Sequence, residues 1–243
     1  MNRFKDQTNE SDSSATPLPG SGSQNEAFSI SAVITGSDPE PISFAQCLQM
    51  LEEKGKQNFN ESFAILKSDH ELISKLLAYF FRDAEKAEQY KINLNKGILL
   101  CGPIGCGKTS LMSLMRHFLP PTHRHIMKSC RDISFDFIQD GYEVIHRYSR
   151  QAINDRSGEL PIYCFDDLGT ESNLKYYGNE CNVMAEVLLS RYDLFVSRKL
   201  VTHITTNLNS SEIEKLYGNR VRSRMREMFN LIAFDKGAED KRK

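Results

Sequence analysis

The sequence predicts an α/β fold around a mainly parallel sheet of five strands, and three observations lead to this prediction. An apolar run at 98–101 is followed at once by a glycine-rich loop and then by a helical apolar pattern. The run at 161–165 is almost continuously apolar and ends in two aspartates, which is typical of a parallel strand buried on both faces. Strand-like runs at 125–130, 200–207 and 229–234 alternate with helical segments. Helices on both faces of this sheet would give three layers.

The glycine-rich loop, residues 102–109, reads Gly-Pro-Ile-Gly-Cys-Gly-Lys-Thr and has the spacing of a Walker A loop. Glycines allow positive φ and bring backbone N–H groups close to phosphate oxygens, and the following helix adds its N-terminal donors. Because a strand precedes the loop and a helix follows it, we reject an incidental glycine-rich turn. We therefore expect a P-loop NTPase fold that binds ATP with Mg²⁺. The expected nucleotide contacts are Gly102, Pro103, Ile104, Gly105, Cys106, Gly107, Lys108, Thr109 and Ser110.

Within this loop, Lys108 is expected to bridge the β- and γ-phosphates, and the Thr109 hydroxyl to bind Mg²⁺. Asp166 and Asp167 follow the apolar run of the later strand, at the end of the sheet where ligands bind in open α/β folds. This is a Walker B pattern, in which Asp166 holds the metal and Asp167 activates or orients the attacking water. The alternative is a pair of surface aspartates that merely closes a strand.

Asn207 ends the strand-like run at 200–207, where its amide would reach between the two Walker segments and position the lytic water. The alternative is that Asn207 caps the next helix, although Ser210 or Ser211 is the better candidate for that cap.

Composition limits the kinds of function. A net charge of −1 argues against a globally cationic nucleic-acid binder, so any DNA contact needs a local patch or several assembled copies. The N-terminus lacks the apolar core of a signal peptide, and no apolar run is long enough to span a membrane. The six cysteines include no C-x-x-C pair, which favours free, mostly buried thiols over zinc or disulfides. We expect a cytoplasmic protein with no membrane partner.

Four regions are predicted along the chain. Residues 1–40 are rich in Ser, Gly and Pro and are expected to form a disordered tail, with the patch 28–34 as a strand only if a partner pairs with it. Residues 41–92 form a small helical annex, whose apolar stripe either packs on the next domain or meets a partner. Residues 93–236 form the ATPase domain, and 237–243 form a basic C-terminal tail.

The segment 220–228 carries four arginines on a helical pattern. A solvated basic face is the usual meaning of such a run. Beside an ATP site, two other meanings compete with it: an arginine finger that reaches the γ-phosphate in a neighbouring subunit, and contacts to DNA phosphates.

Several short motifs together resemble the DnaC/DnaI/IstB group of AAA+ ATPases, which are replicative helicase loaders and ATPase subunits of transposition systems. The resemblance covers roughly residues 94–234, and the first 90 residues lie outside it. The motifs occur in the order and at about the spacing of that group. They are Asp166-Asp-Leu-Gly-Thr-Glu171, Arg191-Tyr192, Thr205-Thr-Asn-Leu208 and Tyr217-Gly-Asn-Arg-Val-Arg-Ser-Arg-Met225.

This resemblance implies that Asn207 is sensor 1, that Arg224 is the arginine finger and that Arg220 supports it. It also implies ATP-dependent homo-oligomers that act on a replicative helicase or a recombinase, and that contact DNA, expected to be single-stranded, through the assembled subunits. Many AAA+ proteins have Glu where this chain has Asp167, so hydrolysis is expected to be slow. Only nine residues follow Phe234, which leaves no room for a helical lid.

Three functions therefore compete. The first is an ATPase that loads a helicase in DNA replication, and the second is the ATPase of a transposition or mobile-element system. The third is a P-loop phosphotransferase for a small metabolite, which needs an acceptor pocket and a lid that the sequence does not indicate.

Overall fold

The computed structural model describes residues 26–31, 41–149, 160–171, 174–176 and 179–242. Most of the predicted tail, residues 1–25 and 32–40, lies outside the described residues, as does Lys243. The strands are β1 (Ala27–Phe28), β2 (Ile42–Ser43), β3 (Gly97–Cys101), β4 (Ile126–Ser129), β5 (Tyr163–Leu168), β6 (Leu174–Tyr176), β7 (Asn179–Cys181), β8 (Thr202–Thr206) and β9 (Phe229–Ala233). The helices are α2 (Phe44–Asn58), α3 (His70–Phe80), α4 (Ala84–Gln89), α5 (Lys108–Met115), α6 (Cys130–Asp140), α7 (Glu143–Arg147), α8 (Val183–Arg198) and α9 (Ser210–Met228).

The central sheet has five strands in the order β4-β5-β8-β3-β9, and every neighbouring pair is parallel. The predicted five-stranded sheet is thereby confirmed. Since β3 lies between β8 and β9, the strand that leads into the glycine-rich loop is an interior strand, and its first four residues are buried. The carboxyl ends of β3, β5 and β8 therefore meet at one edge of the sheet.

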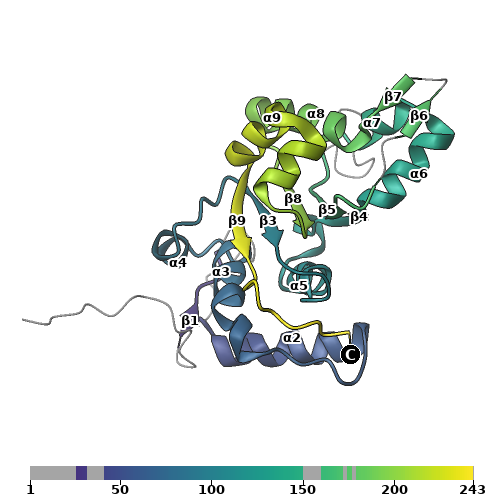
Figure 1. The fold of residues 1–243 in the computed structure, drawn as a ribbon. Coiled ribbons are helices and arrows are strands. Elements are labelled where there is room, and N and C mark those ends of the chain that lie inside the picture. Colours follow the sequence, from purple (N-terminus) through teal and green to yellow (C-terminus); the bar gives the residue numbers. More distant parts are fainter. Residues whose placement is uncertain (1–25, 32–40, 150–159, 172–173, 177–178, 243) are drawn as a thin grey trace, which may run out of the picture.

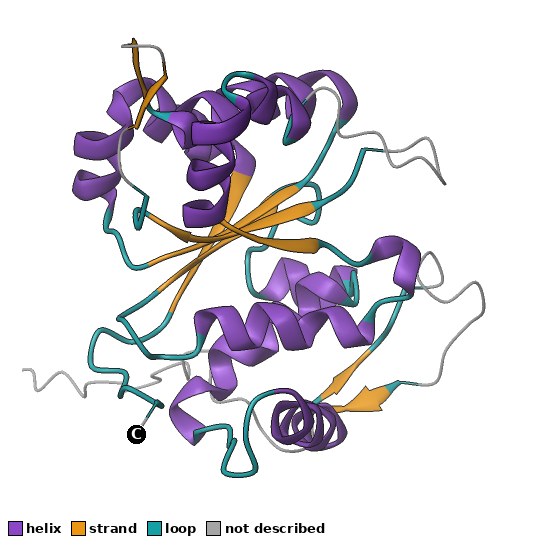
Figure 2. Cartoon of the chain, turned by 90° about the vertical axis from the view of Figure 1, so that its right-hand side faces the viewer, coloured by secondary structure: helices purple, strands orange, loops and turns teal. Residues whose placement is uncertain are grey.

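Helices cover both faces of the sheet and make three layers (Figures 1 and 2). The annex helices α2 and α3 pack with α5 on one face, in a single buried cluster that includes Ile98 and Leu100 of β3. Helices α6 to α9 build the second cluster on the other face, around Phe165 and Ile204. Alternate side chains of β3 point to opposite faces, as the pleat of a strand requires, so Leu99 belongs to the second cluster.

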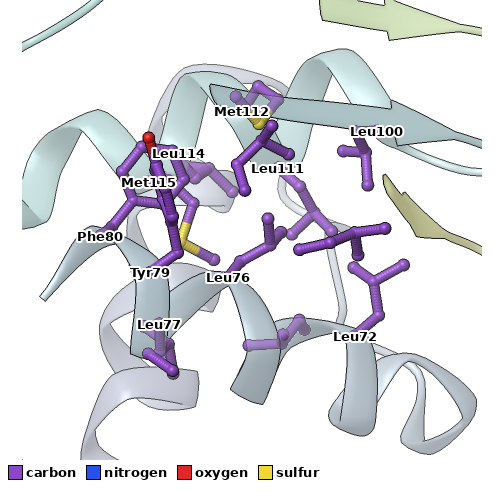
Figure 3. Packing of buried hydrophobic residues seen from close by; sticks show 14 of the residues in the cluster. Leu72, Leu76, Leu77, Tyr79, Phe80, Leu100, Leu111, Met112, Leu114 and Met115 are labelled. Carbon is purple, nitrogen blue, oxygen red and sulfur yellow. The ribbon is translucent and has the colours of Figure 1, made fainter. Parts of the chain in front are cut away.

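The apolar stripe of the annex is packed on α5 and on the central sheet. Leu72, Leu76 and Phe80 of α3 lie against Leu111 and Met115 of α5 (Figure 3). Burying side chains of this size stabilises by roughly 1.5–3 kcal/mol each. The helix that follows the phosphate loop is thus held by the annex.

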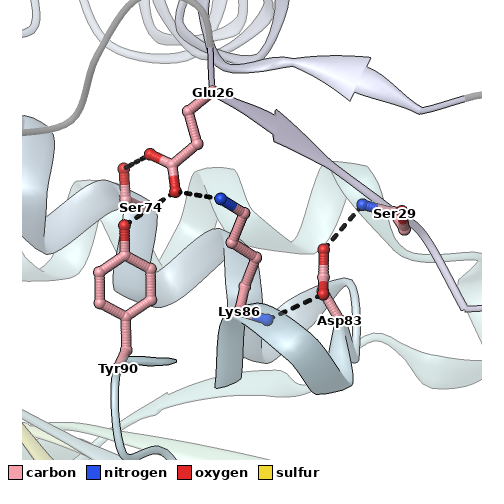
Figure 4. Close-up of polar contacts among 6 residues, drawn as sticks. All are labelled: Glu26, Ser29, Ser74, Asp83, Lys86 and Tyr90. Carbon is pink, nitrogen blue, oxygen red and sulfur yellow. Dashed lines mark hydrogen bonds and ion pairs between the residues drawn. The ribbon is translucent and has the colours of Figure 1, made fainter. Parts of the chain in front are cut away.

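Residues 26–31 depart from the expectation of a solvated tail. Phe28 is fully buried, and β1 pairs antiparallel with β2 inside the chain, so no partner is needed. The Glu26 carboxylate accepts hydrogen bonds from Lys86 Nζ at 2.8 Å and Tyr90 Oη at 2.9 Å (Figure 4). The Ser29 N–H donates to the Asp83 carboxylate at 2.8 Å. The tail prediction is wrong here because a single aromatic residue supplies enough buried area to order a short polar segment.

Other departures are local. The apolar pattern over 134–148 favours one helix, but the structure has two, α6 and α7, separated at Gly141, where φ is 58°. A glycine such as Gly55 often interrupts a helix, but α2 continues through it to Asn58. The antiparallel hairpin of β6 and β7 was not anticipated.

After β9 the described residues, 234–242, form turns and contain no further helix or strand. They run from the end of the sheet toward the C-terminal end of α2 (Figure 1). Among the helices of the described residues, none has the length and apolar character to cross a membrane.

Candidate functional site

The phosphate loop connects β3 to α5 and has the backbone that its glycines permit. Gly105 and Gly107 have φ of 81° and 100°, in the left-handed region, and Gly107 occupies the N-cap position of α5. The first N–H groups of α5 therefore point into the loop, where an anion would meet unpaired donors and the positive end of the helix.

Lys108 is held inside this loop and is only 5% exposed. Its Nζ donates to the carbonyl oxygens of Gly102 at 3.0 Å and Pro103 at 2.8 Å. Two carbonyl oxygens of the loop thereby hold the ammonium group within the loop itself.

Asp166 and Thr109 are 57 positions apart in the sequence and meet in the structure. The Thr109 hydroxyl donates to the two carboxylate oxygens of Asp166 at 3.0 and 3.1 Å. Burial raises the pKa of Asp166, and the neighbouring charge of Asp167 adds to this, while hydrogen bonds from Thr205 and Thr109 oppose it. A hydroxyl and a carboxylate in contact are hard oxygen ligands of the kind Mg²⁺ prefers, so these two residues fit the metal.

Thr205, on β8, orients both aspartates. Its hydroxyl donates to Asp166 Oδ1 at 2.6 Å and accepts from the Asp167 N–H at 2.9 Å. No role was assigned to this residue from the sequence, although it stands in the Thr-Thr-Asn-Leu motif. A threonine two residues before a strand-terminal Asn is the signal that was available.

Asp167 has a φ of 54°, in the left-handed region, at an irregularity in the pairing of β5 with β8. Asp and Asn tolerate this conformation better than residues with longer side chains do. This backbone is a physical reason for finding Asp, rather than the more common Glu, at this position.

Asn207 lies just beyond β8, is exposed and faces the same cavity as Lys108 and Asp167. It does not cap α9, and neither do Ser210 and Ser211. Asn209 is the cap, because its side chain accepts hydrogen bonds from the N–H groups of Ser211 and Glu212. In return, the Glu212 carboxylate accepts a hydrogen bond from the Asn209 N–H at 2.7 Å. The capping alternative is therefore removed by the geometry, since a reciprocal capping box needs the pair Asn209 and Glu212.

One open cavity of about 510 Å³ brings most of the predicted residues together. Its predicted lining residues are Ile104, Gly105, Gly107, Lys108, Thr109, Ser110, Asp167 and Asn207. Gly102 and Pro103 instead line a more apolar cavity of about 550 Å³ between β9 and α9, and Cys106 is buried. The first cavity is also lined by Phe59, Asn60, Phe63, Thr170, Lys241 and Arg242, which sequence reasoning did not assign to the site.

Arg224 does not line this cavity. Helix α9 bends at Gly218, and the arginine-bearing half lies against α8, where the Arg224 guanidinium sits 4.0 Å from the centre of the Tyr192 ring. Tyr192 is itself oriented by a 2.7 Å hydrogen bond to Glu227. Arg220 is exposed. Within one chain, the structure therefore keeps both arginines apart from the phosphate loop.

A buried contact connects the Walker B loop to α9. The Glu171 carboxylate accepts from the Tyr217 hydroxyl and from the Gly169 N–H, the latter at 2.9 Å. Burial and the Glu171 charge raise the pKa of Tyr217, so the phenol stays protonated and donates. Both residues stand in the motifs that the sequence resembles, but only the tertiary structure pairs them.

This combination of a parallel sheet, a phosphate loop after an interior strand and an aspartate on the next-but-one strand defines a P-loop NTPase fold. No protein-family model matches the chain. The uncharacterized protein C115.02c of Schizosaccharomyces pombe is 31% identical over 130 residues, which are 49% of this chain. The match spans 26% of the length of that relative, about a quarter.

Solved structures with a similar chain path include proteins of DNA replication. The DnaC helicase loader shares 18% identity at a TM-score of 0.49, over 75% of this chain and 99% of that chain. DnaI shares 20% at 0.44, over 66% and 85%, and AMPPCP-bound DnaA from Aquifex aeolicus shares 18% at 0.44, over 72% and 49%. DnaC and DnaI are the loaders that the sequence motifs resemble. At these values the similarity does not extend to an activity or a partner.

Proposed function

We propose that this protein is an AAA+ ATPase that binds and slowly hydrolyses Mg-ATP and acts in DNA replication as a helicase-loader-like protein. The observation that supports this most is the hydrogen bond from Thr109 to Asp166, because it joins the loop that lines the cavity with Lys108 to the first aspartate of the Walker B segment. The replication role rests on the motif resemblance.

In this proposal the phosphates bind the N–H groups of the loop and Lys108. Thr109 and Asp166 hold Mg²⁺, which neutralises charge on the phosphates when bound. Asp167 and Asn207 face the position of the γ-phosphate and orient the attacking water.

Arg224 acts in trans in this proposal, because its own chain holds it on Tyr192 and outside the cavity. A cation–π contact at an exposed site is worth about 0.5–1 kcal/mol, so a neighbouring γ-phosphate can recruit the guanidinium at little cost. The protein would then form homo-oligomers when ATP is bound.

Nucleotide binding is tested with Lys108→Ala. We expect this variant to keep its fold and to lose most Mg-ATP affinity in calorimetry, while Lys54→Ala, an exposed lysine on α2, binds like wild type. Asp167→Asn keeps the left-handed backbone and the metal ligand, so it should bind ATP and lose about 10²- to 10⁴-fold in turnover. Wild-type affinity in Lys108→Ala would contradict the site.

The assembly is tested by mixing variants. Arg224→Ala should bind ATP and hydrolyse it poorly, since a finger is worth about 10³–10⁵ in rate. Adding Lys108→Ala should restore turnover at interfaces where an intact loop meets an intact Arg224. If Arg224 contacts DNA instead, turnover without DNA stays normal and DNA affinity falls.

The partner distinguishes the proposal from its main alternative, the ATPase of a transposition or mobile-element system. Affinity capture with the Asp167→Asn variant and ATP, from a cytoplasmic lysate, should retain a ring helicase and single-stranded DNA. A recombinase in its place would favour the transposition system. Phosphate transfer to a small metabolite would favour the phosphotransferase.

A further inference from the structure

Part of the wall of the cavity at the phosphate loop has no role in the phosphate binding or hydrolysis proposed above. Its phosphate end is accounted for by the loop and the aspartates. The rest of the wall is formed by Phe59, Asn60 and Phe63 of the annex, and by Lys241 and Arg242 of the C-terminal segment. These residues come from the annex and from the last described residues of the chain, outside both Walker segments.

Phe59 stands out among the aromatic side chains because it is 44% exposed in a concave site. It follows directly after α2, and its N–H closes that helix by donating to the Gly55 carbonyl at 2.9 Å. Its ring centre lies 5.8 Å from that of Phe63, with 31° between the ring planes. An exposed ring backed by a second ring offers a flat apolar surface to a ligand.

Phe63 is held firmly in its place by α2. A Cβ atom on Gly55 would lie 2.1 Å from Cδ1 of Phe63, so the ring rests directly on the helix backbone. Phe63 also lines a small neighbouring cavity together with Gly107 and Ser110. The aromatic pair is therefore next to the start of α5, where the phosphate loop ends.

The C-terminal segment closes the same wall. The Lys241 N–H donates to the Gly105 carbonyl at 3.0 Å, and its ammonium pairs with Asp69, a residue of the annex that is 5% exposed. Asp240 lies so close to Gly105 that a Cβ there would be 2.0 Å from its carboxylate. Annex, loop and C-terminal segment thus meet at one point, and Arg242 faces the cavity from there.

We propose that Phe59, supported by Phe63, is the stacking platform for the purine base of the bound nucleotide, in a subsite that Lys241 and Arg242 close. This inference rests on the proposed nucleotide site and adds to it the residue that recognises the base. With the triphosphate bound along the loop, a base that follows the annex wall of the same cavity meets the exposed ring of Phe59. Stacking needs only a π-face, so the platform increases affinity for the nucleoside part.

The test compares Mg-ATP with Mg-tripolyphosphate, which has the phosphates and no base, by calorimetry on the full chain. Phe59→Ala should lower ATP affinity about 5- to 150-fold, the fold-change of one stacked base, and leave tripolyphosphate affinity within twofold of wild type. Phe59→Tyr should restore ATP affinity. The matched control is Phe135→Ala, which removes an aromatic ring that is 51% exposed on α6, away from the cavity.

A second readout uses the absence of tryptophan from the sequence. Phe59→Trp gives the chain a single tryptophan at the platform, and Phe135→Trp gives a single one far from it. ATP should change the emission of the first variant, and tripolyphosphate should not. Neither ligand should change the emission of the second.

The inference is overturned if Phe59→Ala binds ATP like wild type, or if it loses ATP and tripolyphosphate affinity equally. In both cases the proposed nucleotide site stands when Lys108→Ala loses both ligands. If the wild-type protein binds neither ligand, the proposed function itself is wrong, and the subsite with it.

Discussion

Strand β8 places one buried polar cluster on each face of the sheet. The two clusters differ in whether their buried side chains carry a charge. His203 points to the annex face, where it meets His125 with 5.1 Å between ring centres. Thr202, the preceding residue, points to the other face and accepts from Arg191 Nε at 2.6 Å. Arg191 is fully buried, and both histidines are at most 3% exposed.

On the annex face the buried groups become neutral. Burial lowers the pKa of His125 to about 3, and burial followed by the neighbouring His125 lowers that of His203. His125 Nε2 donates to the Met112 carbonyl at 3.1 Å, and His203 Nδ1 accepts from the Ile98 N–H at 3.1 Å. Each histidine can make its hydrogen bond as a neutral imidazole, so this face of the sheet buries no histidine charge that would need an acidic partner.

On the opposite face the buried group keeps its charge. Burial lowers the pKa of Arg191 to about 10, still far above neutrality. Its other donors reach the carbonyl oxygens of Tyr148, Pro161 and Val201 at 3.1–3.2 Å, and its guanidinium carbon lies 5.2 Å from the centre of the Tyr163 ring. A buried imidazole, which titrates near neutrality, can therefore lose its charge. A buried guanidinium keeps its charge and needs hydrogen-bond acceptors for its N–H groups.

The largest effect is expected from removing that charge. Arg191→Met leaves three buried carbonyl groups without their donor and should lower the free energy of unfolding by about 3–5 kcal/mol. Urea denaturation measures this, with Arg198→Met, an exposed residue at the end of the same helix, as a control expected within about 0.5 kcal/mol of wild type. A decrease in the free energy of unfolding of less than about 1 kcal/mol would show that the hydrogen bonds of Arg191 contribute little to the stability of this face.

An intermediate effect is expected from acid on the annex face. The folded-state pKa of His125 lies below its usual value of about 6.5, so the unfolded chain binds the proton more tightly. The stability from this residue is present at neutral pH and is lost as the pH falls from about 6.5 toward 3. Between pH 7 and 5, His125 alone should cost about 2 kcal/mol.

The measurement is urea denaturation at several pH values. His125→Phe should reduce the slope of stability against pH by about 1.4 kcal/mol per unit near pH 5.5, since one proton no longer distinguishes the two states. His123→Ala, an exposed histidine nearby, should leave the slope unchanged. An equal slope in wild type and His125→Phe would mean that His125 is charged in the folded protein.

The smallest effect is expected from the hydrogen bond between Tyr217 and Glu171. Tyr217→Phe should cost about 1–2 kcal/mol, because the carboxylate keeps its bond to the Gly169 N–H. A double-mutant cycle with Glu171→Gln should give a coupling energy of at least about 0.5 kcal/mol. Additive effects would show that the Walker B loop and α9 are not energetically connected through this pair.

Much of the site was predictable because it depends on local order in the sequence. The spacing of Gly105, Gly107 and Lys108 after an apolar run predicts strand, loop and helix, since these residues set their own backbone. The aspartates at 166 and 167 were predicted to lie at the carboxyl end of a strand for the same reason, because they follow an almost continuously apolar run that is typical of a buried parallel strand. The five-stranded sheet follows from the alternation of such runs.

The tertiary structure alone decided which distant residues meet. Thr205 reaches Asp166 because β8 is the neighbour of β5 in the sheet. The order of strands in a sheet cannot be predicted from the residue pattern of one strand. Phe28 was assigned to a tail because its neighbours in sequence are polar, yet its burial depends on a core built by α2 and α3. Phe59 faces the cavity at the phosphate loop for a similar reason, since the annex packs on α5. Local sequence sets backbone conformation, whereas long-range packing sets which side chains share a site.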